Sequence, residues 1–156
     1  MERAGKEEQK ESLVEETRTI LEEAGMVLPG IQALFGFQLI AVFNARFDEL
    51  TAALQALHLI ALVAGAISMS LVMTPAAYHR IAERGRTSSR FTALASWLIA
   101  AAMAPLALSI ALDAFVVSMM IAGNPVVGAL IGASLATMFV AMWFVWPTVE
   151  ARRRRR

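Results

Sequence analysis

The sequence predicts an all-α protein, a four-helix transmembrane bundle with an amphipathic cytoplasmic helix at its N-terminus. Of the 156 residues, 58% are hydrophobic and 17% are charged, whereas soluble domains carry about 25% charged residues. The acids between positions 27 and 149 are Asp48, Glu49, Glu83 and Asp113. The central segments are therefore apolar on all faces, which is typical of helices surrounded by lipid rather than by water.

The charge pattern divides the chain into an acidic cytoplasmic segment (1–24), a four-span transmembrane domain (25–149) and a polyarginine cytoplasmic tail (150–156). The first segment holds eight acids and four bases, a net charge of −4. Apolar or small side chains recur at helical spacing from Leu13 to Ala24, so we expect an amphipathic helix over residues 11–24. Gly25 is expected to end this helix.

Four apolar stretches, expected to span the membrane, cover residues 27–43, 52–73, 93–122 and 126–147. A hydrocarbon core of about 30 Å needs about 20 helical residues, and the first stretch is at the short end of this range. Pro29 suits the first turn of a helix. The third stretch is longer than required, so we expect it to tilt, protrude or kink at Pro105. The short connections favour antiparallel neighbours, and Pro125 is expected to start the last helix.

The basic residues predict the orientation of the spans. In a four-span arrangement, 13 of the 14 lysines and arginines fall on one side, and only Arg46 falls on the other. Cytoplasmic loops carry an excess of lysine and arginine. We therefore expect a multi-pass protein of the inner (plasma) membrane with both termini in the cytoplasm.

Asp113 is the most informative polar residue, because it lies within the apolar run "LALSIALDAFVVSMM". A carboxylate at the centre of a bilayer costs about 2.5–3.5 kcal/mol on insertion scales, so it needs a partner or a water-filled cavity. His58 is expected at a similar depth, together with Gln55, Gln38 and Ser109. These residues predict a proton or cation pathway, a buried hydrogen-bond cluster that fixes helix packing, or a protonated Asp113 that donates one bond.

Small residues in the last stretch predict close helix packing. Gly128 and Gly132 form a GxxxG motif that Ala136 extends, and small residues allow helix backbones to approach closely in lipid. Gly65 lies on a similar small face of the second span, with Ala61. The sequence leaves open whether the motif packs within one chain or between chains.

Basic residues in the segment "TPAAYHRIAERGRTSSR" predict an interface with lipid head groups. The arginines are Arg80, Arg84, Arg86 and Arg90. They serve either as an interface anchor and topology signal or as a site for anionic lipid head groups, and the arginine tail admits the same two interpretations. Pro75 is expected to end the second span. The acidic segment could dock on these basic stretches as a cytoplasmic collar.

Other classes of function lack support in the sequence. There is no cysteine, and two histidines are too few for a convincing zinc site. No Ser–His–Asp arrangement, phosphate loop or HExxH motif is evident, so we expect no enzyme activity, no metal and no cofactor. Nucleic-acid binding is not expected either, because no folded reader accompanies the arginines.

Three runs in the first half of the chain resemble a family of small bacterial four-span membrane proteins of unassigned function, common in actinobacteria. The runs are Arg18–Leu21 (RTIL), Pro29–Phe37 (PGIQALFGF) and Pro75–Arg80 (PAAYHR). The resemblance implies a membrane fold and no particular activity.

Two functions remain open from the sequence. The first is an oligomeric ion channel or proton-coupled carrier that uses Asp113 and its polar neighbours. The second is a non-conducting accessory or scaffold protein that binds partners or anionic lipid through its charged face. Four spans leave little room for a pathway within one chain, so the first function predicts a homo-oligomer in the lipid bilayer.

Overall fold

The computed structural model describes residues 2–83 and 88–155, with side chains from residue 11 onward, and it is helical in almost all of this range. The helices are α1 (Glu2–Ala41), α2 (Ala45–Asp48), α3 (Ala52–Tyr78), η1 (His79–Glu83), α4 (Ser89–Ala122), α5 (Pro125–Phe139), η2 (Val140–Val145) and α6 (Trp146–Arg154). Segments η1 and η2 are π-helical turns that continue α3 and α5. Four helical stretches are long and apolar enough to cross a membrane. The predicted all-α fold with four spans is therefore confirmed.

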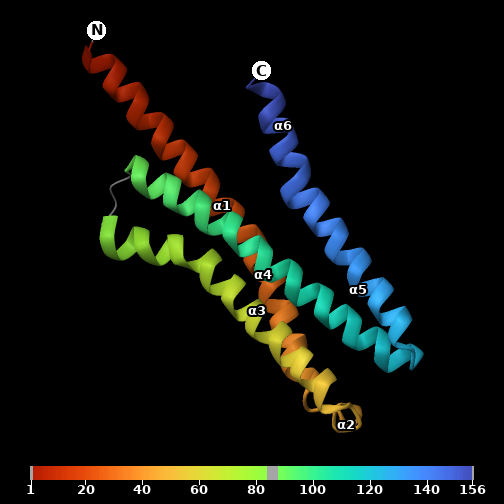
Figure 1. Ribbon diagram of the computed structural model, residues 1–156. Coiled ribbons are helices and arrows are strands. Elements are labelled where there is room, and N and C mark those ends of the chain that lie inside the picture. The colour runs from red at the N-terminus through yellow and green to blue at the C-terminus, as the bar shows by residue number, and fades with distance from the viewer. Residues whose placement is uncertain (1, 84–87, 156) are drawn as a thin grey trace.

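Consecutive spans run antiparallel, and α4 lies at the centre of the arrangement (Figure 1). It packs against α3, α5 and α1, and α1 also contacts α3. Both termini lie at one end of the molecule, whereas α2 and the connection from α4 to α5 lie at the opposite end (Figure 1). This arrangement agrees with the short connections that the sequence contains.

Helix α1 is continuous, which corrects two expectations from the sequence. Residues 11–24 do not form a separate amphipathic helix, because α1 passes through both Gly25 and Pro29 without a break. An interior glycine costs about 1 kcal/mol and a proline about 3 kcal/mol in an isolated helix. Contacts with α3 and α4 on both sides of these residues offset this cost. At about 1.5 Å per residue, the 40 residues of α1 are also longer than a bilayer core requires.

One face of α1 accounts for its continuity. Thr17, Ala24, Ile31 and Gln38 follow one another at intervals of seven residues, and each is buried. A spacing of seven residues keeps side chains on one helix face over several turns. The same face therefore packs against the other helices from the terminal end of the molecule to the last turn of α1.

The contacts along this face change from polar to apolar and back to polar. Near the termini, the hydroxyls of Thr17 and Thr92 lie 2.9 Å apart in a buried hydrogen bond between α1 and α4. The middle of the molecule holds an apolar cluster, whose buried members are Ala24, Ile31, Val72 and Ala102. Beyond this cluster, Gln38 reaches a second polar region.

The GxxxG motif packs α5 against α4 of the same chain. A Cβ at Gly128 would lie 3.1 Å from the carbonyl oxygen of Phe115, and a Cβ at Gly132 would lie 3.0 Å from that of Ala111. Only glycine allows the two backbones to approach this closely. The connection before α5 is equally specific, because Gly123 adopts a φ of +61° and Pro125 begins the helix as expected.

The segment after α3 differs from the sequence expectation. Pro75 is buried within α3 rather than at its end, and the helix continues to Tyr78 and then into η1. The amide of His79 reaches the carbonyls of Pro75 and Ala76, so the backbone stays paired beyond the proline. Neighbouring helices allow prolines within transmembrane helices in this way.

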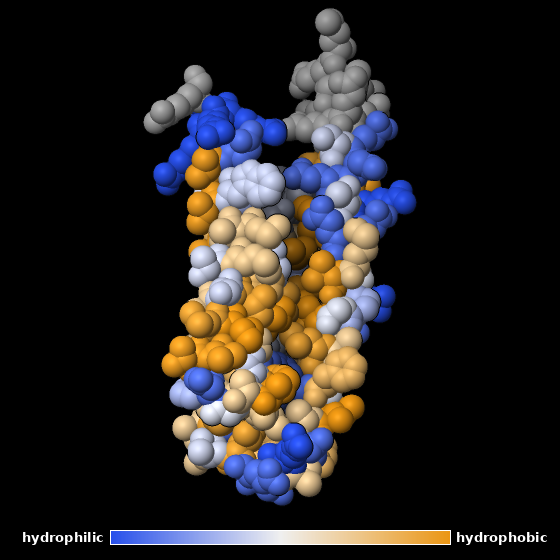
Figure 2. Space-filling model, turned by 90° about the vertical axis from the view of Figure 1, so that its right-hand side faces the viewer, coloured by the Kyte–Doolittle hydropathy of each residue, from blue (hydrophilic) through white to orange (hydrophobic). Residues whose placement is uncertain are grey.

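The surface has the pattern of a membrane protein. Figure 2 shows a broad apolar band around the middle of the molecule and hydrophilic residues toward both ends. Large side chains such as Ile40, Ile121 and Leu130 are exposed within the spans. Since water would not tolerate this much exposed apolar surface, the chain is a multi-pass membrane protein.

Candidate functional site

A buried pair formed by His58 of α3 and Asp113 of α4 is the centre of the candidate site. The side chains are 8% and 15% exposed, and Nδ1 of His58 lies 3.0 Å from Oδ1 of Asp113. Both residues lie within apolar spans. Burial of two such groups in lipid is favourable only when each has a partner, and here they are partners of each other.

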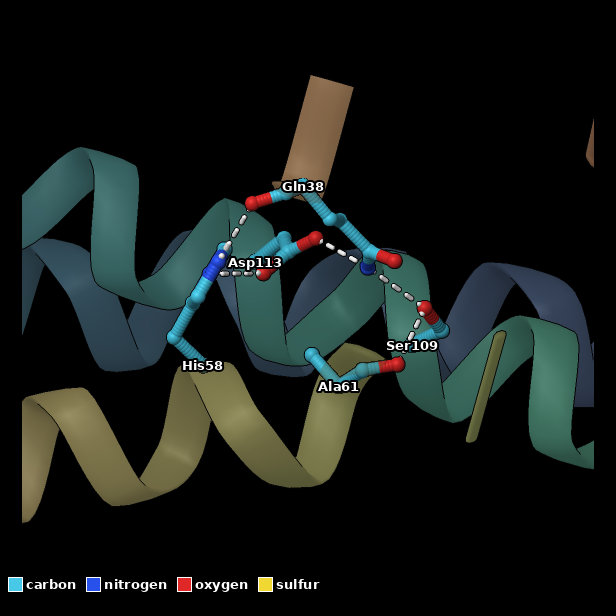
Figure 3. A network of polar contacts seen from close by, with 5 residues as sticks. All are labelled: Gln38, His58, Ala61, Ser109 and Asp113. Atoms are coloured by element: carbon cyan, nitrogen blue, oxygen red, sulfur yellow. Dashed lines mark hydrogen bonds and ion pairs between the residues drawn. The ribbon is translucent and has the colours of Figure 1, made fainter. Parts of the chain in front are cut away.

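The second ring nitrogen of His58 fixes the tautomer. Nε2 lies 3.0 Å from the backbone carbonyl oxygen of Gln38, and Figure 3 shows the ring between this carbonyl and the carboxylate of Asp113. A carbonyl oxygen can only accept, so Nε2 must carry a proton and donate it. Gln38 lies in the last turn of α1, where helix carbonyls are free to accept bonds from other groups.

This geometry places one proton between His58 and Asp113. If the carboxylate is ionised, Nδ1 donates and the ring is an imidazolium. If Nδ1 is unprotonated, Oδ1 of the carboxylic acid donates to it. In both cases the pair is neutral overall. Without this proton, a lone pair on Nδ1 would face the negative carboxylate, and the site would carry one negative charge.

Gln38 and Ser109 complete the network on the other side of the carboxylate. Nε2 of Gln38 donates to Oδ2 of Asp113 and, at 2.8 Å, to Oγ of Ser109. Ser109 donates in turn to the carbonyl oxygen of Ala61 at 2.8 Å. Three helices, α1, α3 and α4, thus contribute to one connected set of hydrogen bonds (Figure 3).

Gly65 provides the space that the amide of Gln38 occupies. A Cβ at this position would lie 3.1 Å from Oε1 of Gln38 and 3.2 Å from Oγ of Ser109. Oε1 is buried and has no hydrogen-bond partner among the residues that the structure describes. The small face that the sequence shows on the second span therefore allows a polar side chain of α1 to enter the interior.

Helix α2 covers the side of the pair that faces away from the two termini. The rings of Phe47 and His58 meet edge to face with their centroids 5.3 Å apart. Gln55 does not join the network of Asp113, because its Nε2 donates to the carbonyl oxygen of Phe47 at 3.1 Å. This bond holds α2 in place above the site.

A pocket of about 300 Å³ borders the pair. It is formed by the end of α1, by α2, by His58 and by the half of α4 that lies nearer to α2. Its lining residues are Leu34, Phe37, Gln38, Ala41, Asn44, Phe47, Leu50, His58, Asp113, Val116, Val117 and Met120. The pocket connects the pair with the end of the molecule at which α2 lies.

The comparisons with known proteins assign a family but no activity. A family model described as a family of unknown function, DUF6328, matches residues 6–147. The chain belongs to the DUF6328 family. Comparison with curated proteins and with solved structures gave no match. The resemblance to a family of four-span membrane proteins of unassigned function is thereby confirmed, and the site of this DUF6328 protein has to be interpreted from its own geometry.

The remaining residues singled out in the sequence of this DUF6328 protein lie away from the pair. Arg80 and Arg90 are exposed near the terminal end, whereas Arg84 and Arg86 lie outside the described residues. Ala136 is partly buried on α5. No group of three or more metal-binding side chains gathers within residues 11–83 and 88–155.

A described acid of α1 and a described acid of the tail form ion pairs within their own helices. Glu22 pairs with Arg18 at 2.8 Å, and Glu150 pairs with Arg154 at 3.6 Å, each within one helix. Within the described ranges, no ion pair joins residues 11–24 to the tail. The cytoplasmic collar stays a prediction.

Phe37 and Phe47 are site residues that the sequence analysis missed. Phe47 lies in the connection after the first span, where no periodic pattern indicates its partner. Phe37 belongs to an apolar run in which every residue suits a lipid-facing helix. The only available signal was the position of Phe37 next to Gln38.

Proposed function

We propose that this protein is a proton-coupled carrier of the plasma membrane, in which His58 and Asp113 together bind the transported proton. The observation that carries the proposal is the placement of both ring nitrogens of His58 against oxygen atoms, one of them an obligate acceptor. The proton that we propose to be transported is the one held between Nδ1 of His58 and Oδ1 of Asp113. Intramembrane acids and histidines commonly serve as proton relays.

The position of the pocket supports a carrier rather than an open channel. The pocket reaches the pair from the α2 end. Toward the termini, the apolar cluster around Ile31 and Ala102 separates the pair from the other side of the membrane. A carrier needs a site that faces one side at a time, whereas an open channel needs a continuous polar path.

The orientation of the carrier follows from its charges. The exposed Arg80 and Arg90 and the described arginines of the tail (152–155) lie at the same end as both termini (Figure 1). The excess of basic residues on cytoplasmic segments favours a cytoplasmic position for this end. The pocket would then open toward the outside of the cell.

Proton flux into liposomes tests the proposal. The full chain is reconstituted, a pH gradient is imposed, and the internal pH is followed with a dye. We expect proton flux above that of empty vesicles, and we expect Asp113→Asn to remove it. Asp48→Asn is the matched control, because Asp48 is exposed on α2 and does not line the pocket.

The outcome separates transport from a purely structural network. If the network only fixes helix packing, the native protein and Asp113→Asn will leak equally, at the level of empty vesicles. That result would reject the carrier. Circular dichroism of each variant verifies that the comparison is made between folded proteins.

A second candidate function is an accessory role at the membrane surface, and the exposed arginines favour it. Arg80, Arg90 and the described tail residues are exposed at one end of the molecule. Each base near an anionic leaflet contributes about 1 kcal/mol of attraction. Recovery of a stable partner through residues 1–24 would favour this function. Assembly into a homo-oligomer stays a prediction, and Gly128 and Gly132 no longer support it because they pack within the chain.

A further inference from the structure

We propose that the pocket beside His58 and Asp113 binds a small organic cation with an apolar body, and that this cation replaces the proton held by the pair. The inference rests on the proposed carrier function and names the substrate class of the same site. It follows from the charge, the aromatic content, the surroundings and the size of the pocket.

The charge of the pocket favours a cation over an anion. Among the twelve residues that line it, Asp113 is the only acid, and none is a lysine or an arginine. The protonated pair is neutral, and the deprotonated pair carries one negative charge. A ligand with one positive charge therefore restores neutrality when the proton leaves, whereas an anion would find no group to balance it.

Two aromatic rings strengthen the preference for a cation. Phe37 and Phe47 line the pocket from α1 and α2. Aromatic faces attract cations through the ring quadrupole, most of all quaternary or substituted ammonium groups. A carboxylate and two phenyl rings around one small space are features that suit an organic ammonium ion better than a hydrated metal ion, which prefers oxygen ligands.

The rest of the lining favours an apolar body. Leu34, Val116, Val117 and Met120 contribute aliphatic and thioether surface. Phe37 is 72% exposed and Val117 is 51% exposed, so the pocket borders the lipid-facing surface between α1 and α4. A lipophilic cation can therefore reach the pocket from the bilayer as well as from water.

The exchange conserves charge and needs no other reactant. The proton leaves Asp113 or His58 for the water on the α2 side, and the cation occupies the place next to the carboxylate. No covalent bond forms. Among the elements packed around the pair, α3 contributes the titratable His58, α1 contributes the neutral Gln38, and α5 contains no titratable residue. Helix α2 carries Arg46 and Asp48, which are exposed and do not line the pocket. Competition is therefore between one proton and one cation.

The size of the pocket limits the ligand. A volume of about 300 Å³ equals that of roughly ten water molecules at about 30 Å³ each. Benzyltrimethylammonium is a probe of comparable size with a permanent charge. Neopentylbenzene is its neutral isostere, in which a carbon replaces the nitrogen.

Calorimetric titration of the full chain in detergent tests the inference. We expect benzyltrimethylammonium to bind and to release one proton per cation into weakly buffered solution, as followed with a pH dye. At pH values at which the pair is protonated, the affinity for benzyltrimethylammonium should fall about tenfold for each pH unit of acidification, because one proton competes with one cation. Neopentylbenzene should release no proton.

Three variants identify the groups responsible. Asp113→Asn should weaken binding of the probe about tenfold or more and abolish proton release. Phe37→Leu should weaken binding of the probe severalfold. Without the probe, the pair in this variant should keep its proton. Asp48→Asn should change neither property.

Three results would overturn the inference. The first is failure of the probe to bind, the second is equal binding of the probe and its neutral isostere, and the third is binding of the probe without proton release. The native protein supplies all three tests, so they do not depend on the folding of a variant. If the pair takes up a proton but the probe does not bind, this inference fails and the proposed carrier stands. If proton uptake does not depend on Asp113, both fail.

Discussion

Replacement of Gly65 with alanine should destabilise the protein through the polar network. The added Cβ would lie 3.1 Å from Oε1 of Gln38 and 3.2 Å from Oγ of Ser109. Both neighbours are buried, at 3% and 0% exposure, and both are held by hydrogen bonds, so they must shift by a few tenths of an ångström. Overpacking of this kind costs about 1–3 kcal/mol. The shift would also lengthen the bond from Gln38 to Asp113.

Gly36→Ala is the matched control for this prediction. Gly36 lies in α1, and a Cβ there would meet nothing within 4 Å. Both variants gain about 1 kcal/mol of helix propensity, so the difference between them reports the contact alone. We expect Gly65→Ala to be less stable than Gly36→Ala by about 1–3 kcal/mol. The assay is unfolding of the full chain in mixed micelles, followed by circular dichroism. Equal stabilities would refute the role assigned to Gly65.

Three further predictions concern contacts between helices. Gly132→Ala should lower the free energy of unfolding by about 1–3 kcal/mol, because the new Cβ would meet a backbone carbonyl at 3.0 Å; an unchanged unfolding midpoint would show that α5 packs differently. Thr17→Val should cost about 0.5–1.5 kcal/mol through loss of the hydrogen bond with Thr92, while proton flux stays unchanged; altered flux would contradict this assignment. His58→Phe should destabilise the protein by up to about 3–5 kcal/mol, and by less when Asp113→Asn is already present. A double-mutant cycle measures this difference. Additive losses would show that the two residues are not paired.

The membrane fold could be predicted because lipid imposes strong constraints on the sequence. Long apolar stretches with few charges can only be spans, and short connections make neighbouring spans antiparallel. The helix that starts at Pro125 follows from the same simple rules. These features depend on local sequence alone.

The continuity of α1 could not be predicted from local rules. Gly25 and Pro29 disfavour a helix in isolation. The decisive feature is a face of buried residues at intervals of seven, from Thr17 to Gln38, that packs on α3 and α4. Tertiary contacts outweigh the local preference here, as they do at Pro75 in α3.

The core of the candidate site could be predicted from the depth at which polar residues lie in the membrane. Asp113 needed a partner in the membrane, and His58, Gln38 and Ser109 lay at matching depths, where the structure brings them together. Gln55 lies near the end of its span, so a backbone carbonyl of α2 was within reach instead. The short helix α2 begins after the capping residue Asn44, but four residues are too few for a periodic pattern to indicate a helix.

The protonation state of His58 tests the central claim most directly. Nitrogen NMR of the full chain with labelled histidine rings reports it, and His79→Gln leaves His58 as the only labelled ring. We predict that Nε2 of His58 carries a proton, which it donates to the carbonyl oxygen of Gln38, and that the Nδ1 signal reports a hydrogen bond to Asp113 that changes in Asp113→Asn. An unprotonated Nε2, or an Nδ1 signal unchanged by Asp113→Asn, would contradict this prediction.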